Sequence, residues 1–210
     1  MNYKIKKSTT ECIFDHTVSK NVIIENGYDY YHPAHVHPST VKSVDRIYEH
    51  GNLSILQYNL IRWPMFKFLK NYTKKFIVIK ITSKDDLKIY SIPSNFEFAT
   101  NSIIKCEELN DNKVKYIAEF YLKPLSFFIN LLSPLIMKIR DKGEQVRLKE
   151  DLAMWKLRQK AVNENFQDNQ SCVKEKEEIL IDQWFPGGKT PVTDLWNLFS
   201  PGKDKDFSDN

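Results

Sequence analysis

Apolar and polar residues alternate one by one between residues 113 and 122. The apolar positions in this segment are Val114, Tyr116, Ala118, Phe120 and Leu122. The positions between them include Lys113, Lys115 and Glu119. A period of two is typical of a β-strand with one buried face. The sequence Asn-Asp-Asn at 110–112 favours a turn just before it. The pattern therefore predicts a turn followed by a strand.

The stretch from residue 41 to residue 113 also has the character of strands. In one part of it, Leu56, Tyr58 and Leu60 alternate with Ile55, Gln57 and Asn59. A β-branched run from Phe76 to Ile81 follows after a loop near Pro64. Before these strands, residues 26–41 are rich in Tyr, His and Pro and favour an irregular helix or a tight loop. A short N-terminal segment ending near Ile24 precedes them.

A helical region is predicted from Pro124 to about Phe166, with a break at Ser133-Pro134 and another at Gly143. Its second half is amphipathic, because Leu148, Leu152, Trp155 and Gln159 fall near one line at helical spacing and the first three form an apolar stripe. Its first half, 124–139, is the longest apolar stretch but is shorter than the roughly 20 residues that a bilayer requires. We interpret this half as a buried helix, with a membrane-surface element as the alternative.

This order of elements predicts an α+β protein with the helix-grip fold, in which an antiparallel sheet wraps around a long C-terminal helix and leaves a cavity. The chain has 210 residues, of which 41% are hydrophobic, enough for one sizeable core. We expect a single domain over 1–200. Within it, 167–178 form a polar loop and 179–200 a tail that docks on the domain, and 201–210 are expected to be disordered.

Charge and cysteine content exclude several classes of function. The 31 basic and 27 acidic residues are interspersed, which argues against nucleic acid as a partner. A basic run from Lys67 to Lys75 fits an acidic protein surface or a solvated rim. Three cysteines without paired spacing indicate neither a disulfide framework nor a zinc ribbon. No signal peptide is recognisable at the N-terminus, so a reducing, cytoplasmic location is expected.

Histidines are concentrated in the irregular segment that precedes the strands. His32, His35 and His37 lie within six residues, and Asp29 stands three residues before the first of them. One interpretation is a surface loop with partly stacked rings. The other is a metal site, since imidazole and carboxylate are ligands of iron and zinc.

The wider string Asn26-x-x-Asp29-x-x-His32-x-x-x-x-His37 resembles the signature of the Rieske-type non-haem iron oxygenases. The resemblance implies that His32 and His37 bind a mononuclear Fe(II) ion and that Asp29 bridges electron transfer from a neighbouring Rieske cluster. It also implies that Asn26 lies near the open coordination positions. His35 is outside the pattern and is expected beside the ligands or in the pocket.

The resemblance also requires a carboxylate ligand from the late helix. The segment from Lys149 to Gln159, with the acidic pair Glu150-Asp151, is similar to the corresponding part of the family. Asp151 flanks the apolar stripe, where a carboxylate can turn inward, and is the expected ligand. Glu150 points further from the stripe and is the alternative ligand. A solvated acidic pair on an exposed helix is the competing interpretation.

One departure from the family is large. A Rieske [2Fe-2S] cluster needs Cys-x-His and Cys-x-x-His motifs, but Phe14 stands two residues after Cys12, and the other two cysteines are also without such a histidine. We therefore expect that this chain binds no cluster and receives electrons from a Rieske ferredoxin, a reductase or a cluster-bearing subunit. Either a split system or a truncated gene would account for the missing domain.

The expected function is an aromatic-ring-hydroxylating type of oxygenase reaction, in which an apolar or aromatic small molecule is hydroxylated or demethylated with O₂ at the iron. Residues 29–37 also resemble the branch that contains pheophorbide a oxygenase, and the family makes a homo-oligomer such as a trimer an expected arrangement. The alternative is a metal-free carrier or sensor of a hydrophobic ligand with the same fold, which would need the cavity but not the clustered histidines.

Overall fold

The computed structural model describes residues 3–14, 18–26, 29, 32–38, 40–50, 53–61, 73–83, 85–109 and 113–164. Its strands are β1 (Lys6–Phe14), β2 (Val41–His50), β3 (Leu53–Ile61), β4 (Thr73–Thr82), β5 (Asp86–Pro93), β6 (Phe98–Leu109) and β7 (Lys113–Pro124). Its helices are α1 (Lys20–Glu25), α2 (His32–Val36) and α3 (Phe127–Asn163). The polar loop, the docking tail and the disordered end predicted for 167–210 lie outside the described residues, as does most of the basic run from Lys67.

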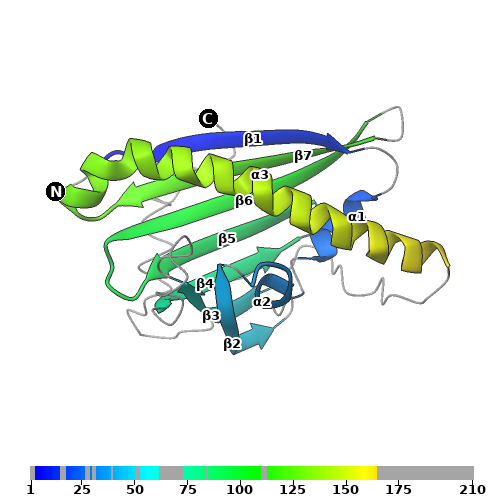
Figure 1. Cartoon of the computed structure of the whole chain (residues 1–210), viewed down its shortest axis with the longest axis horizontal. Coiled ribbons are helices and arrows are strands. Elements are labelled where there is room, and N and C mark those ends of the chain that lie inside the picture. Colours follow the sequence, from blue (N-terminus) through cyan, green and yellow to red (C-terminus); the bar gives the residue numbers. More distant parts are fainter. Residues whose placement is uncertain are drawn as a thin grey trace.

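The seven strands form one antiparallel sheet in the order β1-β7-β6-β5-β4-β3-β2 (Figure 1). This confirms the predicted strand region, including the alternation in β7, where Val114, Tyr116 and Ala118 are buried. The first strand was not predicted. β1 has few apolar residues, and its position is fixed by pairing with β7, from Lys6 opposite Leu122 onward. Such long-range pairing leaves little trace in the local sequence.

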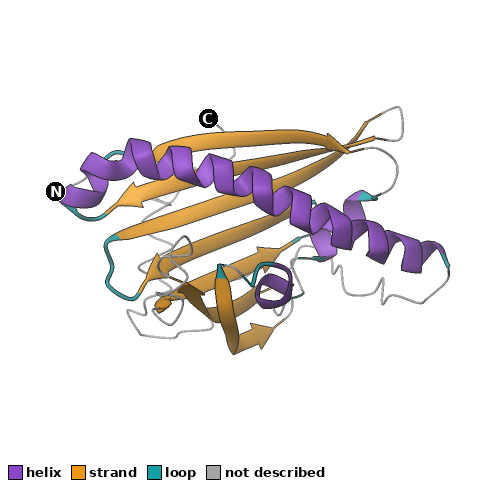
Figure 2. Cartoon of the chain, viewed as in Figure 1, coloured by secondary structure: helices purple, strands orange, loops and turns teal. Residues whose placement is uncertain are grey.

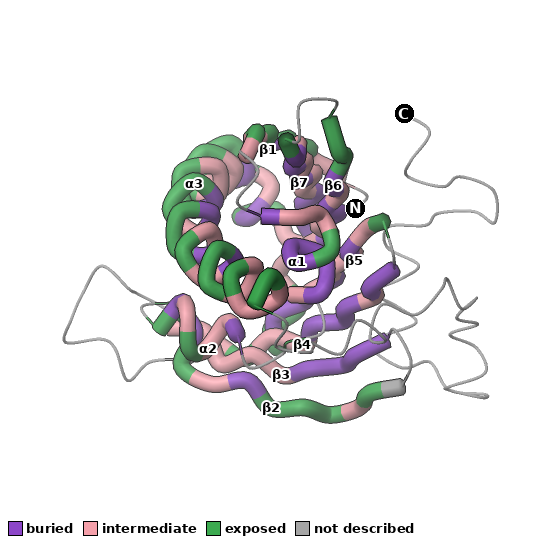
Figure 3. Tube along the Cα trace, turned by 90° about the vertical axis from the view of Figure 1, so that its right-hand side faces the viewer, coloured by how far each residue is buried: buried purple, intermediate pink, exposed green. Residues whose placement is uncertain are grey.

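The long helix α3 lies across one face of the sheet, and α1 lies close to its C-terminal half (Figures 1 and 2). Trp155 and Leu148 from α3 share a core cluster with Tyr116 of β7 and with Ile24 of α1. The view along the helix shows that the side toward the sheet is buried and the outer side is exposed (Figure 3). A sheet that wraps around a long C-terminal helix is the predicted helix-grip fold.

Both predicted breaks in the late helix are wrong, because α3 continues through Pro134 and Gly143. Proline lacks the N–H that would bond to the carbonyl four residues earlier, here that of Asn130. The Ser133 hydroxyl takes over, donating to Asn130 O at 2.8 Å. Ser133 is fully buried, so this bond is shielded from water. A side-chain donor thus compensates for the proline, and the helix does not end there.

We expect Ser133→Ala to lower the free energy of unfolding by about 1–2 kcal/mol, because it leaves the Asn130 carbonyl without its donor. In a Pro134→Ala background the backbone N–H introduced at 134 can make that bond, so the same serine substitution should cost less. Urea denaturation of the four chains of this cycle measures the difference. An equal cost in both backgrounds would contradict the compensation.

The apolar stretch 124–139 was interpreted as a buried helix, and this is also wrong. Of its helical residues only Ile129 and Ser133 are buried. Large apolar side chains on the other side of the helix are more than half exposed, among them Phe127, Phe128 and Leu131. The sheet covers one side of this part of α3, so its remaining apolar residues face outward.

Within the described residues, no helix combines the length and the apolar character that crossing a membrane would require.

Candidate metal centre

The helix α1 is anchored to the C-terminal half of α3 by two side-chain contacts. Gln159 Oε1 accepts a hydrogen bond from the backbone N of Ser19 at 2.9 Å, just before the helix begins. Arg158 Nη2 donates to Glu25 Oε2 at 3.1 Å, at its last residue. The next residue, Asn26, is thereby held close to α3.

The helix α2 is a single short turn that begins at His32 and ends one residue before His37. The exposed Asp29 side chain accepts from the backbone N of His32 at 2.9 Å, which satisfies an N–H at the start of the helix. The helix ends at Val36, and Thr40 N donates to His37 O at 2.9 Å where the chain turns into β2. His37 therefore lies just beyond the helix.

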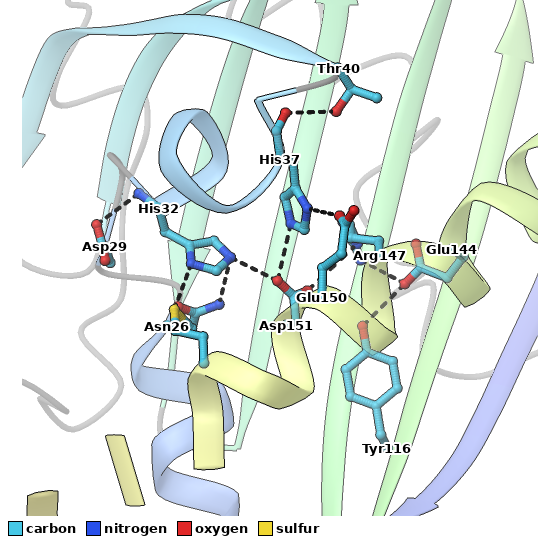
Figure 4. A network of polar contacts seen from close by, with 11 residues as sticks. Asn26, Asp29, His32, His37, Thr40, Tyr116, Glu144, Arg147, Glu150 and Asp151 are labelled. Carbon is cyan, nitrogen blue, oxygen red and sulfur yellow. Dashed lines mark hydrogen bonds and ion pairs between the residues drawn. The ribbon is translucent and has the colours of Figure 1, made fainter. Parts of the chain in front are cut away.

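This early helix end decides where the second imidazole points. On a regular helix, a spacing of five residues would place His32 and His37 about 140° apart. In the structure their ring centroids are 5.4 Å apart and the ring planes are inclined by 88°. Both rings face α3 (Figure 4). The irregular segment expected from the sequence is what allows the two rings to converge.

Asp151 of α3 meets both imidazoles with one carboxylate oxygen. Its Oδ1 lies 2.9 Å from His32 Nε2 and 3.0 Å from His37 Nε2 (Figure 4). All three side chains are buried, with exposed fractions between 5% and 7%. The three donor atoms lie within 4.8 Å of one another. The structure thus brings together the three residues that the sequence singled out as ligands.

The distances in this group fit a shared metal ion. Ligand atoms at about 2.1 Å from a metal and at right angles to each other are about 3.0 Å apart. Both nitrogen-to-oxygen distances agree with this value, which is also that of an ordinary hydrogen bond. Two imidazoles and one carboxylate on one side of an ion leave other coordination positions open, as in the facial triads of Fe(II) enzymes. The donor set could therefore hold a divalent metal ion.

The hydrogen bond behind His37 points the lone pair of its Nε2 toward the centre of the group. His37 Nδ1 lies 2.6 Å from Glu150 Oε2, so this nitrogen carries the proton and donates. In a neutral ring, Nε2 then presents its lone pair to Asp151. His32 Nδ1 faces the sulfur of Met154 at 3.0 Å, and its Nε2 lies 3.3 Å from the amide nitrogen of Asn26. Lone pairs that face a carboxylate need a positive charge between them.

The pKa values of Asp151 and His37 also show that the site favours a positive charge. Burial alone would raise the pKa of Asp151, but hydrogen bonds from His32 and His37 and the charge of Arg147 lower it to about 2. Burial would lower the pKa of His37, but its hydrogen bonds to Asp151 and Glu150 raise it. Without a metal the site therefore favours an ionised Asp151 beside a protonated His37, and a metal cation can take the place of that proton.

A charged cluster lies behind Asp151. Arg147 Nε lies 4.0 Å from Asp151 Oδ2, the oxygen that does not contact the histidines, so the two groups form an ion pair without a hydrogen bond. Arg147 is held in turn by Glu144 at 2.6 Å, and Glu144 accepts from the Tyr116 hydroxyl at 3.3 Å. Arg147 and Met154 were not singled out from the sequence, although they lie four residues before and three residues after Asp151. Residues at these spacings share a helix face, so the signal was present.

The other predicted site residues take distinct places. Asn26 lies beside His32, and its Oδ1 is buried without a hydrogen-bond partner in the described residues. Glu150 contacts His37 from outside the group and not as a third ligand. His35 differs from its expected place beside the ligands, because it is exposed to solvent. Its neighbour Ala34 instead packs against the apolar residues of β2, β3 and β4.

Replacing Glu150 by alanine should weaken metal binding by about 10–100-fold, because a carboxylate on the far nitrogen of a ligand histidine fixes its tautomer and orientation. The affinity of Glu150→Gln should fall between those of the wild type and of Glu150→Ala, since its amide oxygen can still accept the hydrogen bond from His37 Nδ1. Titration with Fe(II) under anaerobic conditions measures the affinity. Glu107→Ala, on the exposed end of β6, is the matched control. Unchanged affinity in Glu150→Ala would remove this role.

Comparison with known proteins identifies the fold but not a family. No family model matches the chain, and no curated protein sequence matches it. Solved structures do match. The Zhui aromatase/cyclase from Streptomyces sp. R1128 aligns with a TM-score of 0.54 and 6% identity, covering 75% of this chain and 95% of that one. The fold is the helix-grip fold.

Two further structures have the same extent of similarity. TTHA0849 from Thermus thermophilus aligns with a TM-score of 0.53 and 11% identity, over 75% of this chain and 99% of the other. Norcoclaurine synthase from Thalictrum flavum aligns with a TM-score of 0.53 and 13% identity, over 73% and 88% of the two chains. At these identities the similarity concerns the fold alone, and the chemistry has to be argued from the site.

Proposed function

We propose that His32, His37 and Asp151 hold a mononuclear Fe(II) ion and that the chain is the catalytic part of a Rieske-type oxygenase. The observation that carries the proposal is the meeting of two imidazoles and one carboxylate oxygen, from segments more than a hundred residues apart, at the spacing of adjacent metal ligands. This set is the ligand set of non-haem Fe(II) oxygenases. The resemblance of the Asn26 to His37 motif to that family is an independent line of support.

The bound iron would supply the chemistry with O₂, and the chain's own residues would bind, orient and exclude water. Glu150 holds the proton on His37 Nδ1, which keeps Nε2 free to act as a ligand. The charge of Arg147, at 4.0 Å from the free oxygen of Asp151, favours the ionised carboxylate. The burial of all three ligands would keep bulk water from the centre. The resemblance to the oxygenase family makes an apolar or aromatic substrate the expected one. The proposed reaction is hydroxylation or demethylation of such a substrate.

The electrons for this reaction would come from a cluster-bearing partner that docks near Asp29, which is exposed next to His32. Neither described cysteine stands in a Cys-x-His motif, because Phe14 lies two residues after Cys12 and Glu108 lies two residues after Cys106.

Anaerobic loading with Fe(II) followed by metal analysis tests the proposal. We expect about one iron per chain, as a single two-histidine, one-carboxylate site requires. His32→Ala and His37→Ala should lose it, whereas His35→Ala should keep it, because His35 is exposed on the same short helix. Equal iron content in all four chains would contradict the proposed ligands.

The second candidate is a metal-free carrier or sensor of a hydrophobic small molecule. It is favoured by the fold, because the helix-grip architecture is shared with proteins of several functions and does not require a metal. A carrier should bind a fluorescent apolar probe equally well in the wild type and in His32→Ala, and neither chain should retain iron. Probe binding that changes on iron loading only in the wild type would favour the oxygenase.

A further inference from the structure

The outer side of the first half of α3 presents apolar side chains to solvent. Five large residues on it are between 54% and 67% exposed, namely Phe127, Phe128, Leu131, Leu135 and Ile139. Leu131, Leu135 and Ile139 follow one another at a spacing of four and therefore form one line along the helix. The exposed apolar area is on the order of 500 Å², comparable to the largest patch on an ordinary monomer, where such patches are often functional. We call this set the outer apolar face.

Lysines accompany these residues on the same side of the helix. Lys138 and Lys142 are exposed and lie three or four residues from members of the outer apolar face, so they are its neighbours on the helix surface. Lys149 continues the series and is followed by the exposed Glu150. Between 127 and 149 the acidic residues are Asp141, which is paired with Arg140 at 3.2 Å, and Glu144, which is buried. The exposed charged residues between 127 and 149 are therefore all lysines.

We propose that the outer apolar face binds the surface of an anionic phospholipid bilayer, with α3 lying in the plane of the interface. A helix with large apolar side chains and lysines together on its free side is suited to this position: the apolar groups enter the acyl boundary, and the lysines reach the lipid phosphates. Lysine is depleted at protein–protein interfaces, so its presence in this face favours a lipid surface over a protein partner. The net charge of +4 acts in the same direction.

The proposal does not depend on the metal centre. The proposed ligand Asp151 is buried, whereas the residues of the outer apolar face are more than half exposed. Substitutions in the outer apolar face can therefore be made without changing the iron ligands. Because their side chains are largely exposed already, they should not destabilise the core.

Cosedimentation with vesicles tests the proposal on the full chain. Vesicles of phosphatidylcholine with about one quarter phosphatidylserine should bind the chain at least about tenfold more strongly than phosphatidylcholine alone, and added salt should weaken the binding. Leu131→Gln combined with Leu135→Gln should reduce binding to the anionic vesicles by at least about tenfold, as should Lys138→Glu combined with Lys142→Glu.

Matched controls remove the same groups elsewhere. Ile13→Gln with Ile47→Gln replaces two exposed apolar residues on strands, and Lys42→Glu with Lys113→Glu changes the net charge by the same amount as the α3 lysine pair. Both should bind vesicles like the wild type, and circular dichroism should show that all variants are folded. Binding lowered as much by the controls would overturn the proposal. The proposal would also be overturned if the chain bound no vesicles and formed a dimer that Leu131→Gln and Leu135→Gln dissociate. The outer apolar face would then join two copies of the chain.

Discussion

Asp151→Ala is expected to abolish iron binding, with a loss of affinity of more than about 100-fold. That value is the upper range for residues that only support a ligand, and Asp151 is placed to do more. It supplies the only carboxylate among the three converging groups, and its Oδ1 is close to both histidine nitrogens. Without it, two neutral imidazoles would have to hold the ion alone. Titration with Fe(II) under anaerobic conditions measures the loss.

Fold stability has to be measured beside affinity, because Asp151 also balances buried positive charge. Removing one partner of a buried ion pair costs about 3–5 kcal/mol, and Asp151 faces both His37 and Arg147. Asp151→Asn keeps the size of the side chain and removes only its charge. It should unfold less readily than Asp151→Ala and still lose iron. Asp141→Ala, on the same helix but paired with Arg140, is the control. A folded Asp151→Asn chain that binds iron with unchanged affinity would contradict the ligand role.

The sequence was a good guide where local pattern and packing agree. β7 was predicted from its alternation because one of its faces is buried, and an irregular segment was predicted over 26–41, where the short helix α2 ends before His37. The position of β1 could not be predicted in this way, because its pairing with β7 depends on residues more than a hundred positions away. Pro134 misled for a related reason, since one buried hydroxyl, that of Ser133, satisfies the carbonyl that proline leaves free.

The candidate site was predicted by residue type and resemblance, and not by the environment that makes it suitable for a cation. That Glu150 contacts His37 depends on how α3 lies over the sheet and over α2. Exposure could not be predicted from the sequence either. The segment 124–139 has the composition of a core helix, but one side of it lies at the surface. Composition indicates what a helix could cover, whereas topology decides whether something covers it.

The largest expected effect on turnover is that of an electron donor. With iron, O₂ and a substrate, the chain alone should give no sustained turnover, and a Rieske ferredoxin with its reductase should restore it. The reason is the electron count: incorporating oxygen from O₂ into a substrate consumes two external electrons, and the sequence has neither a Rieske motif nor a Gly-x-Gly-x-x-Gly fingerprint for a flavin or nicotinamide. Oxygen uptake and product formation, with the donor added or withheld, measure the dependence.

Substitutions of Asp29 distinguish a role in electron entry from a structural role. Its carboxylate accepts from the His32 backbone N, a bond that an asparagine side chain can also make. Asp29→Asn should therefore keep α2, bound iron and bound substrate while donor-supported turnover collapses, and Asp29→Ala should lose the helix contact as well. If Asp29→Asn turns over like the wild type while Asp29→Ala does not, the residue serves to begin the helix and the electrons enter elsewhere. Sustained turnover of the chain with a simple chemical reductant, at the rate that the ferredoxin supports, would show that the partner is not required.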